Sequence, residues 1–153
     1  MDNKIAIFKK LLNLSMKHHI KSTEEMLQLG EQLSKQHKIL LLHWELGAGK
    51  TLLTKGFARG LGIDEKKVQS PTYAYINIYD ERVLHLDMYR IKKYEELVEK
   101  WIIDQILSYD IVVIEWPKFI DSLPLSNFAM IRIEKISENE RVVHVDKHSL
   151  RSW

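Results

Sequence analysis

The residues whose types and spacing point most directly to chemistry are Gly47, Gly49, Lys50 and Thr51. They follow the apolar run at 39–42 and precede a segment with a helical pattern, which is the strand–glycine loop–helix layout of a phosphate-binding loop. Glycines let backbone N–H groups curl round a phosphate, and the helix that follows points its positive end at the same anion. In such a loop the lysine reaches the β- and γ-phosphates, and the hydroxyl binds Mg²⁺. The sequence therefore predicts a nucleotide site built around Lys50 and Thr51.

One position departs from the pattern G-x-x-x-x-G-K-[ST], because Trp44 stands where the first glycine belongs. A Gly-Lys-[Ser/Thr] triplet alone arises by chance in roughly one chain in fifteen of this length, for example in a surface turn that caps a helix. The flanking strand and helix are what favour a phosphate loop over such a turn. Since the first glycine normally eases a bend at the strand exit, we expect Trp44 to change the strain of the loop or to cover the nucleotide without abolishing binding.

Two carboxylates stand at the ends of predicted strands, Asp87 after 83–86 and Glu115 after 111–114. An ATPase needs a carboxylate near the phosphate loop to hold Mg²⁺ or to order the attacking water. Strands of an open α/β sheet deliver ligand-contacting residues at their carboxyl ends. Each carboxylate alone could equally face solvent or cap a helix, but beside a phosphate loop we assign both to the site.

Thr72 and Arg90 are further candidates. Thr72 follows Pro71 in the loop between the phosphate-loop helix and the next strand, where switch-type threonines of P-loop proteins reach the γ-phosphate and Mg²⁺. A turn hydroxyl after a proline explains Thr72 equally well. Arg90 could sense phosphate charge, although an arginine at a helix start more often forms a surface ion pair.

His144, Asp146 and His148 alternate along a predicted strand and so share one face. They could bind a metal, but polar side chains are also expected on the solvent-exposed face of a terminal hairpin, and that interpretation is favoured. The sequence has no cysteine, which excludes disulfides and thiolate sites and is typical of a reducing cytoplasm. A net charge of +2 permits an RNA-bearing partner without indicating one, and no apolar run approaches the roughly 18 residues that span a bilayer.

The spacing of apolar residues and the helix-capping residues predict the helices and strands that position these side chains. Helices are expected over about 23–36, 50–61 and 94–107, and strands over 18–21, 38–43, 73–79, 83–87, 111–115, 128–136 and 141–145. Ser22 and Glu25 have capping-box spacing at the start of the first helix, and Leu97, Trp101 and Ile102 are expected on one side of the last.

The N-terminal residues 3–17 have a basic amphipathic helical pattern. It fits an ordinary packing helix better than a contact with an acidic membrane surface or a partner. We therefore expect an N-terminal amphipathic extension over 1–20 and a single P-loop ATPase domain over 21–153, with an antiparallel hairpin at its C-terminus.

Several motifs, taken together and in order, resemble one known family, the bacterial TsaE (YjeE) ATPases of tRNA threonylcarbamoyladenosine biosynthesis. Residues 45–51 look like the family's phosphate loop, 70–73 like its Ser-Pro-Thr loop, 85–90 like its His-x-Asp-x-Tyr-Arg, and 115–117 like its Glu-Trp-Pro. The resemblance runs from about Ser22 to the C-terminal hairpin. No single motif is specific, but the combination is.

The resemblance implies an α/β fold of the P-loop NTPase type, a three-layer sandwich with a mixed, mainly parallel central sheet. It implies an ATPase that uses ATP and Mg²⁺ and is held against the TsaB–TsaD pair, with tRNA met indirectly through the complex and with no membrane or DNA partner. In the family, the complex forms the threonylcarbamoyl modification at adenosine 37 of tRNAs that read ANN codons. TsaE does not make the carbamoyl bond; its hydrolysis of ATP is thought to reset the complex in the cytoplasm.

The resemblance also implies roles for individual residues. The nucleotide would be bound by Glu45, Leu46, Gly47, Ala48, Gly49, Lys50, Thr51, Leu52 and Trp116. Thr51 and Glu115 would hold Mg²⁺, while Asp87 and Lys50 would act in hydrolysis. Thr72 is assigned to hydrolysis with them on the ground of its place in the loop.

This chain departs from the family at Trp44, at Leu52, where a second threonine is usual, and after 94–97, where a Leu-Gly stretch is missing. These departures bear on the rate of hydrolysis more than on the fold. A non-hydrolysing nucleotide-binding scaffold of the same complex therefore stays open as an alternative. A small-molecule kinase is less favoured because no arginine-rich lid follows the sheet, and the lack of an Asn-Lys-x-Asp stretch argues against a GTPase.

Overall fold

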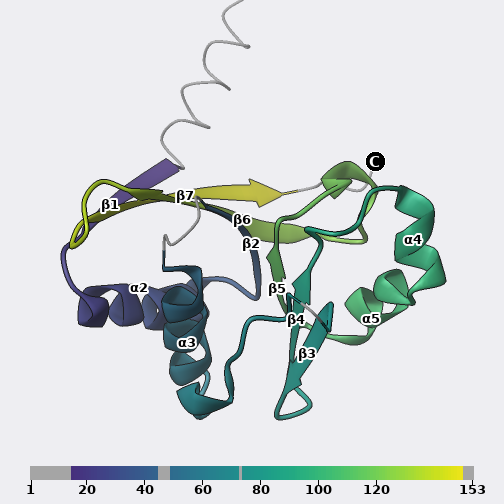
Figure 1. Cartoon of the computed structure of the whole chain (residues 1–153). Coiled ribbons are helices and arrows are strands. Elements are labelled where there is room, and N and C mark those ends of the chain that lie inside the picture. Colours follow the sequence, from purple (N-terminus) through teal and green to yellow (C-terminus); the bar gives the residue numbers. More distant parts are fainter. Residues whose placement is uncertain (1–14, 45–48, 73, 150–153) are drawn as a thin grey trace, which may run out of the picture.

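The computed structural model describes residues 15–44, 49–72 and 74–149, and these residues form a seven-stranded mixed sheet between two helical layers (Figure 1). The elements in chain order are β1 (Ser15–Ile20), α2 (Thr23–Gln36), β2 (Ile39–Trp44), α3 (Lys50–Gly60), β3 (Ile76–Tyr79), β4 (Val83–Asp87), α4 (Tyr94–Glu99), α5 (Ile102–Ser108), β5 (Ile111–Glu115), β6 (Asn127–Lys135) and β7 (Arg141–Ser149). Single 3₁₀ turns occur at Glu65–Lys67 and Ile120–Ser122.

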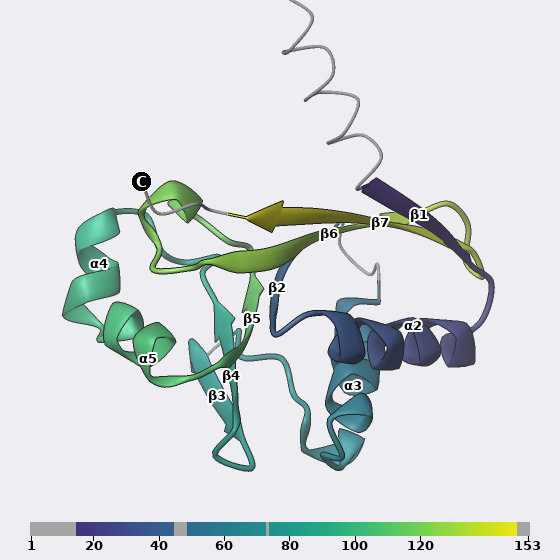
Figure 2. The same cartoon turned by 180° about the vertical axis from the view of Figure 1, so that it is seen from behind.

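The strand order is β1-β7-β6-β2-β5-β4-β3. The four central strands β6, β2, β5 and β4 run parallel to one another, while the pairs β1–β7, β7–β6 and β4–β3 are antiparallel. Helices α2 and α3 cover one face, and α4 and α5 cover the other, as the two opposite views show (Figures 1 and 2). The expected α/β sandwich and its C-terminal hairpin, β6–β7, are confirmed.

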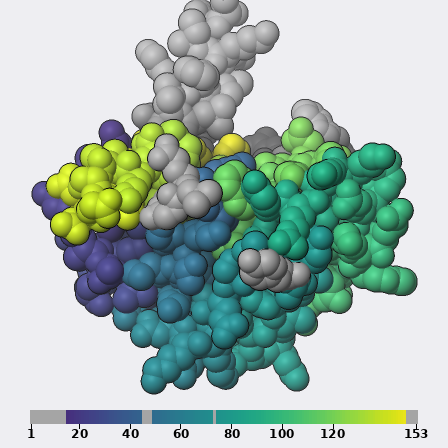
Figure 3. Space-filling view, viewed as in Figure 1, coloured from purple at the N-terminus to yellow at the C-terminus, as the bar shows by residue number. Residues whose placement is uncertain are grey.

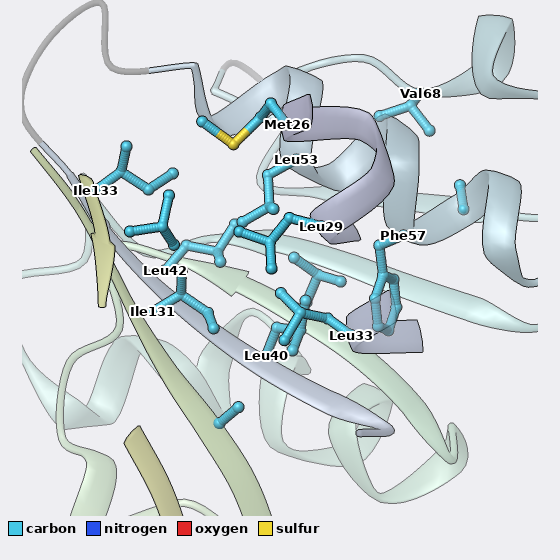
Figure 4. Close-up of a cluster of buried hydrophobic side chains, with 14 of the residues drawn as sticks. Met26, Leu29, Leu33, Leu40, Leu42, Leu53, Phe57, Val68, Ile131 and Ile133 are labelled. Carbon is cyan, nitrogen blue, oxygen red and sulfur yellow. The ribbon is translucent and has the colours of Figure 1, made fainter. Parts of the chain in front are cut away.

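The central strands read as unbroken apolar runs because both of their faces are buried. In β2, Leu40 and Leu42 point toward α2 and α3 and meet Leu33 and Phe57 among others (Figure 4). Leu41, between them, packs in the second cluster, on the side of α4 and α5. All three leucines of β2 are fully buried, which contributes about 1.5–3 kcal/mol each.

Helices α2 and α3 approach each other backbone to backbone. A Cβ atom added at Gly30 would collide with the main chain of Leu53 and Phe57, and one added at Gly56 would collide with that of Leu27. Because α2 begins at a fixed cap, with the Ser22 hydroxyl accepting from the Glu25 N–H at 3.1 Å, this contact fixes α3 as well. The close packing also fixes the position of Lys50, the first residue of α3.

Several boundaries differ from the sequence prediction, and the largest extension is that of β7, predicted over 141–145, which continues to Ser149. The edge strand predicted over 18–21 is present as β1, which begins three residues earlier, inside the range assigned to the N-terminal extension, and pairs with β7. Its mostly exposed side chains fit an edge strand. Residues 1–14 lie outside the described part. The strand expected from residue 73 begins at Ile76, because Tyr75 has a left-handed backbone (φ 64°). Strand β2 continues through Trp44.

The single helix predicted over 94–107 is wrong, because the chain divides into α4 and α5 at Trp101, whose φ is 62°. The prediction that Trp101 shares the buried side with Leu97 and Ile102 is wrong for the same reason. The break lets both aliphatic side chains reach the core, while Trp101 stays 68% exposed. Among the described residues, no helix has the length and apolar character needed to cross a membrane.

Candidate nucleotide site

The first part of the site is the junction between Gly49 and α3. Gly49 caps the helix with φ 98°, a backbone conformation that favours glycine, and its carbonyl accepts from the Leu53 N–H at 3.2 Å. The N-terminal end of an 11-residue helix therefore begins at Lys50, with Thr51 half-buried behind it. The predicted nucleotide-binding residues Glu45, Leu46, Gly47 and Ala48 lie outside the residues that the structure describes.

Trp44, in the place of the usual first glycine, is the last residue of β2 and pairs with Ile133 of β6. Because this position still belongs to the strand, a large side chain fits there without a bend. Its ring packs against that of Trp116 with centroids 5.2 Å apart, and the Nζ of Lys50 lies 4.2 Å from the Trp44 centroid. This is a cation–π contact on the lysine that the sequence assigns to phosphate binding.

The two strand-end carboxylates lie side by side. Asp87 and Glu115 are register partners on the parallel strands β4 and β5, and both are buried. The Oε2 of Glu115 lies 3.9 Å from the Nζ of Lys50. The Oδ1 of Asp87 accepts from the Tyr89 N–H at 2.8 Å. The structure thus brings together Lys50, Asp87 and Glu115, which are far apart in sequence.

Glu115 is fully buried, and within the described ranges neither of its carboxylate oxygens has a hydrogen-bond partner. A buried carboxylate without hydrogen bonds is costly unless a cation or water completes it. Beside Lys50, the residue that precedes Thr51 at the start of α3, these oxygens fit Mg²⁺ or its bound water. Mg²⁺ takes few protein ligands and keeps waters and phosphates as the others, so the site needs no larger acidic cluster.

Residues 15–44, 49–72 and 74–149 contain no cluster of three or more histidine or acidic side chains able to hold a metal. Of the alternating trio His144, Asp146 and His148, the two histidines make other contacts. His144 Nε2 lies 2.8 Å from Glu134 Oε2, and the ring of His148 stacks on Phe128 at 5.2 Å. The interpretation of these residues as ordinary hairpin side chains is the better one.

Trp116 turns the chain away from the sheet at the end of β5. Its φ is 52°, a sparsely populated conformation for a bulky residue, and its N–H donates to the Leu42 carbonyl at 3.1 Å. The indole lies between Trp44 and Tyr89, with ring centroids 5.2 and 5.3 Å away. Lys118 braces the same region by donating to the Tyr89 carbonyl at 2.8 Å. An aromatic row therefore flanks Lys50.

Thr72, the predicted switch residue, is half-buried in its loop, and its hydroxyl lies 2.7 Å from that of Ser70. In this structure the hydroxyl is thus used inside the loop. Arg90 is exposed after β4.

The contact between His85 and Glu115 was not foreseen from the sequence. His85 is fully buried, and its Nε2 lies 3.1 Å from the Oε1 of Glu115. Its Nδ1 lies 2.8 Å from the hydroxyl of Tyr79, where burial raises the pKa of the phenol. The available signal was the spacing of His85 and Asp87, two residues apart in a strand and hence on one face. The register with β5 was needed to find the partner.

A pocket of about 180 Å³, here named the hairpin pocket, opens beside Gly49. It is lined by Ile20, Lys21, Ser22, Thr23, Met26, Gly49, Leu52, Glu138, Asn139 and Arg141. The lining comes from three places: the β1–α2 junction, the start of α3, and the β6–β7 turn. Figure 3 shows the turn, in yellow-green, over the purple surface of the β1–α2 region.

Comparison with known proteins identifies the family of this chain. The family described as "Threonylcarbamoyl adenosine biosynthesis protein TsaE" matches residues 20–145. The tRNA threonylcarbamoyladenosine biosynthesis protein TsaE of Bacillus subtilis is 32% identical over 124 residues, covering 79% of this chain and 77% of that protein. The protein of the same name from Synechocystis is 39% identical over 106 residues, covering 63% of this chain and 67% of its own length.

The crystal structure of Bacillus subtilis YdiB has the same fold, with a TM-score of 0.62 at 23% identity, and the match covers 89% of this chain and 86% of that one. The family match spans the sheet from the end of β1 into β7 and includes every strand-end residue of the site. The chain therefore belongs to the TsaE family of threonylcarbamoyl adenosine biosynthesis proteins.

Proposed function

We propose that this protein binds ATP with Mg²⁺ and hydrolyses it as a subunit of the machinery that forms threonylcarbamoyladenosine in tRNA. The observation that carries the proposal is the buried Glu115 carboxylate, which lacks hydrogen bonds among the described residues and lies 3.9 Å from Lys50 at the start of α3. A lysine, a hydroxyl and an incompletely satisfied carboxylate at a helix N-terminus suit a nucleotide–cation pair.

Each residue of the proposed site has a separate role in binding or hydrolysis. Lys50 would leave the Trp44 ring and bind the β- and γ-phosphates, helped by the N–H groups at the start of α3. Thr51 and Glu115 would hold Mg²⁺, which neutralises charge on the phosphate oxygens. Asp87, oriented by the Tyr89 N–H, would order the attacking water. Thr72 would join them only after its hydroxyl leaves that of Ser70.

The hairpin pocket suits the adenine base. It adjoins Gly49, so a base there is within reach of phosphates bound at the start of α3. Ile20, Met26 and Leu52 supply apolar walls, and Asn139 supplies a polar edge. In this arrangement Leu52, where the family usually has threonine, contacts the base side of the nucleotide.

We further propose that the protein acts in the cytoplasm together with TsaB and TsaD, and meets tRNA only through them. The family's part in tRNA modification supports this partnership. A pull-down with TsaB and TsaD, with and without ATP, tests it. Recovery of neither partner under both conditions would contradict it.

A second candidate is a subunit that binds ATP without turning it over. The Lys50–Trp44 contact favours it, because the ring competes with phosphate for the lysine. Hydrolysis of ATP measured with and without TsaB–TsaD separates the two functions. Binding without turnover in either condition would favour the second, and a phosphorylated small product would indicate a kinase.

Two substitutions test the site itself. Lys50→Ala should weaken nucleotide binding and lower hydrolysis by about a hundredfold or more, while Glu115→Gln should lower hydrolysis to a similar extent with a smaller effect on binding. Lys55→Ala, five residues further along α3, is the matched control. Unchanged turnover in both site variants would refute the assignment.

A further inference from the structure

A line of buried polar groups runs behind Glu115, away from Lys50. The hydroxyl of Tyr79 lies 2.8 Å from the Nδ1 of His85, and the Nε2 of His85 lies 3.1 Å from the Oε1 of Glu115. At the other end, the same hydroxyl lies 2.9 Å from the Gln69 carbonyl oxygen and accepts from the Gln69 N–H at 3.2 Å. Gln69 directly precedes the loop at 70–72.

The sheet places these groups on one face. Tyr79 and Val83 pack in the cluster under α2 and α3, whereas Leu84 and Leu86 pack in the opposite cluster. His85 therefore points toward α3, as does Glu115, which is two residues after Val113 of the same cluster. Both His85 and Glu115 are fully buried, and Tyr79 is 4% exposed. Apolar side chains could fill this space. The presence of buried polar groups here therefore indicates a role other than packing.

The number of available protons determines how Tyr79, His85 and Glu115 can be linked by hydrogen bonds. The Tyr79 phenol has one proton and two acceptors within 2.9 Å, the Gln69 carbonyl and the Nδ1 of His85. When the proton goes to Nδ1, the neutral ring of His85 carries its own proton on Nε2, facing Glu115. When the proton goes to Gln69, Nδ1 of a neutral ring is the protonated atom and a lone pair faces the carboxylate. Whether Tyr79 donates to Gln69 or to His85 thus determines whether Glu115 faces an N–H group or a lone pair on Nε2.

The two oxygens of Glu115 face different neighbours. Oε1 is the oxygen next to His85, and Oε2 is the oxygen next to Lys50. The Nε2 and Oε1 atoms are at contact distance but are not aligned for a hydrogen bond. A rotation of the carboxylate would complete the bond and leave Oε2 free toward Lys50.

We propose that Tyr79 and His85 are positioning residues for Glu115: they hold Oε1 so that Oε2 meets the cation, and they link this orientation to the 70–72 loop through Gln69. The proposal rests on the proposed function, in which Glu115 helps to hold Mg²⁺. Groups that orient a ligating carboxylate typically change metal affinity 10- to 100-fold when they are removed. Both side chains are buried, and neither is among the residues assigned to nucleotide binding.

The test measures binding of a fluorescent ADP analogue to the full chain, first in EDTA and then across a Mg²⁺ titration. His85→Phe should raise the half-saturating Mg²⁺ concentration about tenfold or more, with nucleotide affinity in EDTA unchanged. His85→Gln retains an N–H donor and should restore part of the loss. Tyr79→Phe, which removes one oxygen, should raise the half-saturating concentration about threefold to tenfold.

The order of the groups is tested by combination. If Tyr79 acts through His85, then adding Tyr79→Phe to His85→Phe changes the Mg²⁺ requirement no further, whereas independent effects would multiply. Tyr109→Phe, a half-buried tyrosine on the opposite face, is the control and should not change it. Urea unfolding of every variant verifies the fold.

The outcomes separate the two proposals. Folded His85→Phe and Tyr79→Phe proteins with the wild-type Mg²⁺ requirement would overturn the positioning role and leave the proposed function intact. Equal weakening in EDTA and in Mg²⁺ would also overturn it, because that pattern indicates general damage to the pocket. A wild-type chain that binds no nucleotide under either condition would overturn the proposed function, and the positioning role with it.

Discussion

The two faces of the sheet are built differently. On the α2–α3 face, two helices meet backbone to backbone at Gly30 and Gly56, and buried polar groups lie beneath them. On the α4–α5 face, two short helices separated by Trp101 cover an apolar cluster and leave several large apolar side chains exposed. His85, Asp87 and Glu115 occupy strand positions that face α3. The difference is what the proposed function requires, with one face positioning the site residues and the other supplying packing.

Of the substitutions that test the difference between the two faces, the largest loss of stability is expected at the contact between α2 and α3. Gly56→Val places side-chain atoms against the main chain of Leu27, so the free energy of unfolding should fall by more than about 3 kcal/mol. Nucleotide binding should fall with it, since α3 must move away from α2. Urea unfolding and nucleotide titration measure the two effects. The exposed Leu107→Ala on the other face should change stability by less than about 0.5 kcal/mol.

On the α4–α5 face, Leu97→Ala should lower the free energy of unfolding by about 3 kcal/mol, within the range for buried leucines. The affinity of the remaining folded protein for nucleotide should stay at the wild-type value, because this cluster lies across the sheet from Lys50. The same two assays check it. A parallel loss of affinity would show that the two faces are coupled.

Trp44→Leu tests the α2–α3 face, where the proposed nucleotide site lies. It removes the ring beneath Lys50, a contact worth about 0.5–1 kcal/mol, so nucleotide affinity should rise roughly two- to fivefold. Titration with a labelled nucleotide measures the change. A fall in affinity would instead mean that Trp44 contacts the nucleotide. Trp101→Leu, remote and exposed, should have no effect.

The smallest effect concerns pH. Burial lowers the pKa of His43 from 6.5, so the unfolded chain binds this proton more readily than the folded chain. Stability should therefore fall as the pH drops below about 6.5 and recover above it. His43→Asn should reduce the difference between urea midpoints at about pH 7.5 and pH 5.5. His19→Asn, at an exposed position of β1, should leave that difference unchanged.

The parts of the fold that could be predicted have local causes. Helix α2 was predicted with the bounds that the structure shows, because Ser22 and Glu25 mark its start and its apolar period is regular. The runs at 39–42 and 111–114 identify the central strands because buried parallel strands do not alternate. The grouping of Lys50, Asp87 and Glu115 followed from the rule that strand ends of an α/β sheet meet at one edge.

The parts that were missed depend on contacts between distant segments. The break at Trp101 has no glycine or proline to mark it; it is set by the packing of Leu97 and Ile102 beneath two separate helices. The need for Gly30 appears only when Gly56 faces it. The contact of His85 with Glu115 requires the register of β4 and β5, which no local pattern encodes.

The aromatic row gives the protein an optical signal of its own. Trp44 and Trp116 are 5.2 Å apart with ring planes tilted by 57°, a geometry in which two indole transitions couple and produce paired circular dichroism bands of opposite sign. Lys50 lies over one member of this pair. A phosphate that draws the lysine away would alter the coupling, so occupancy could be followed in solution without any label.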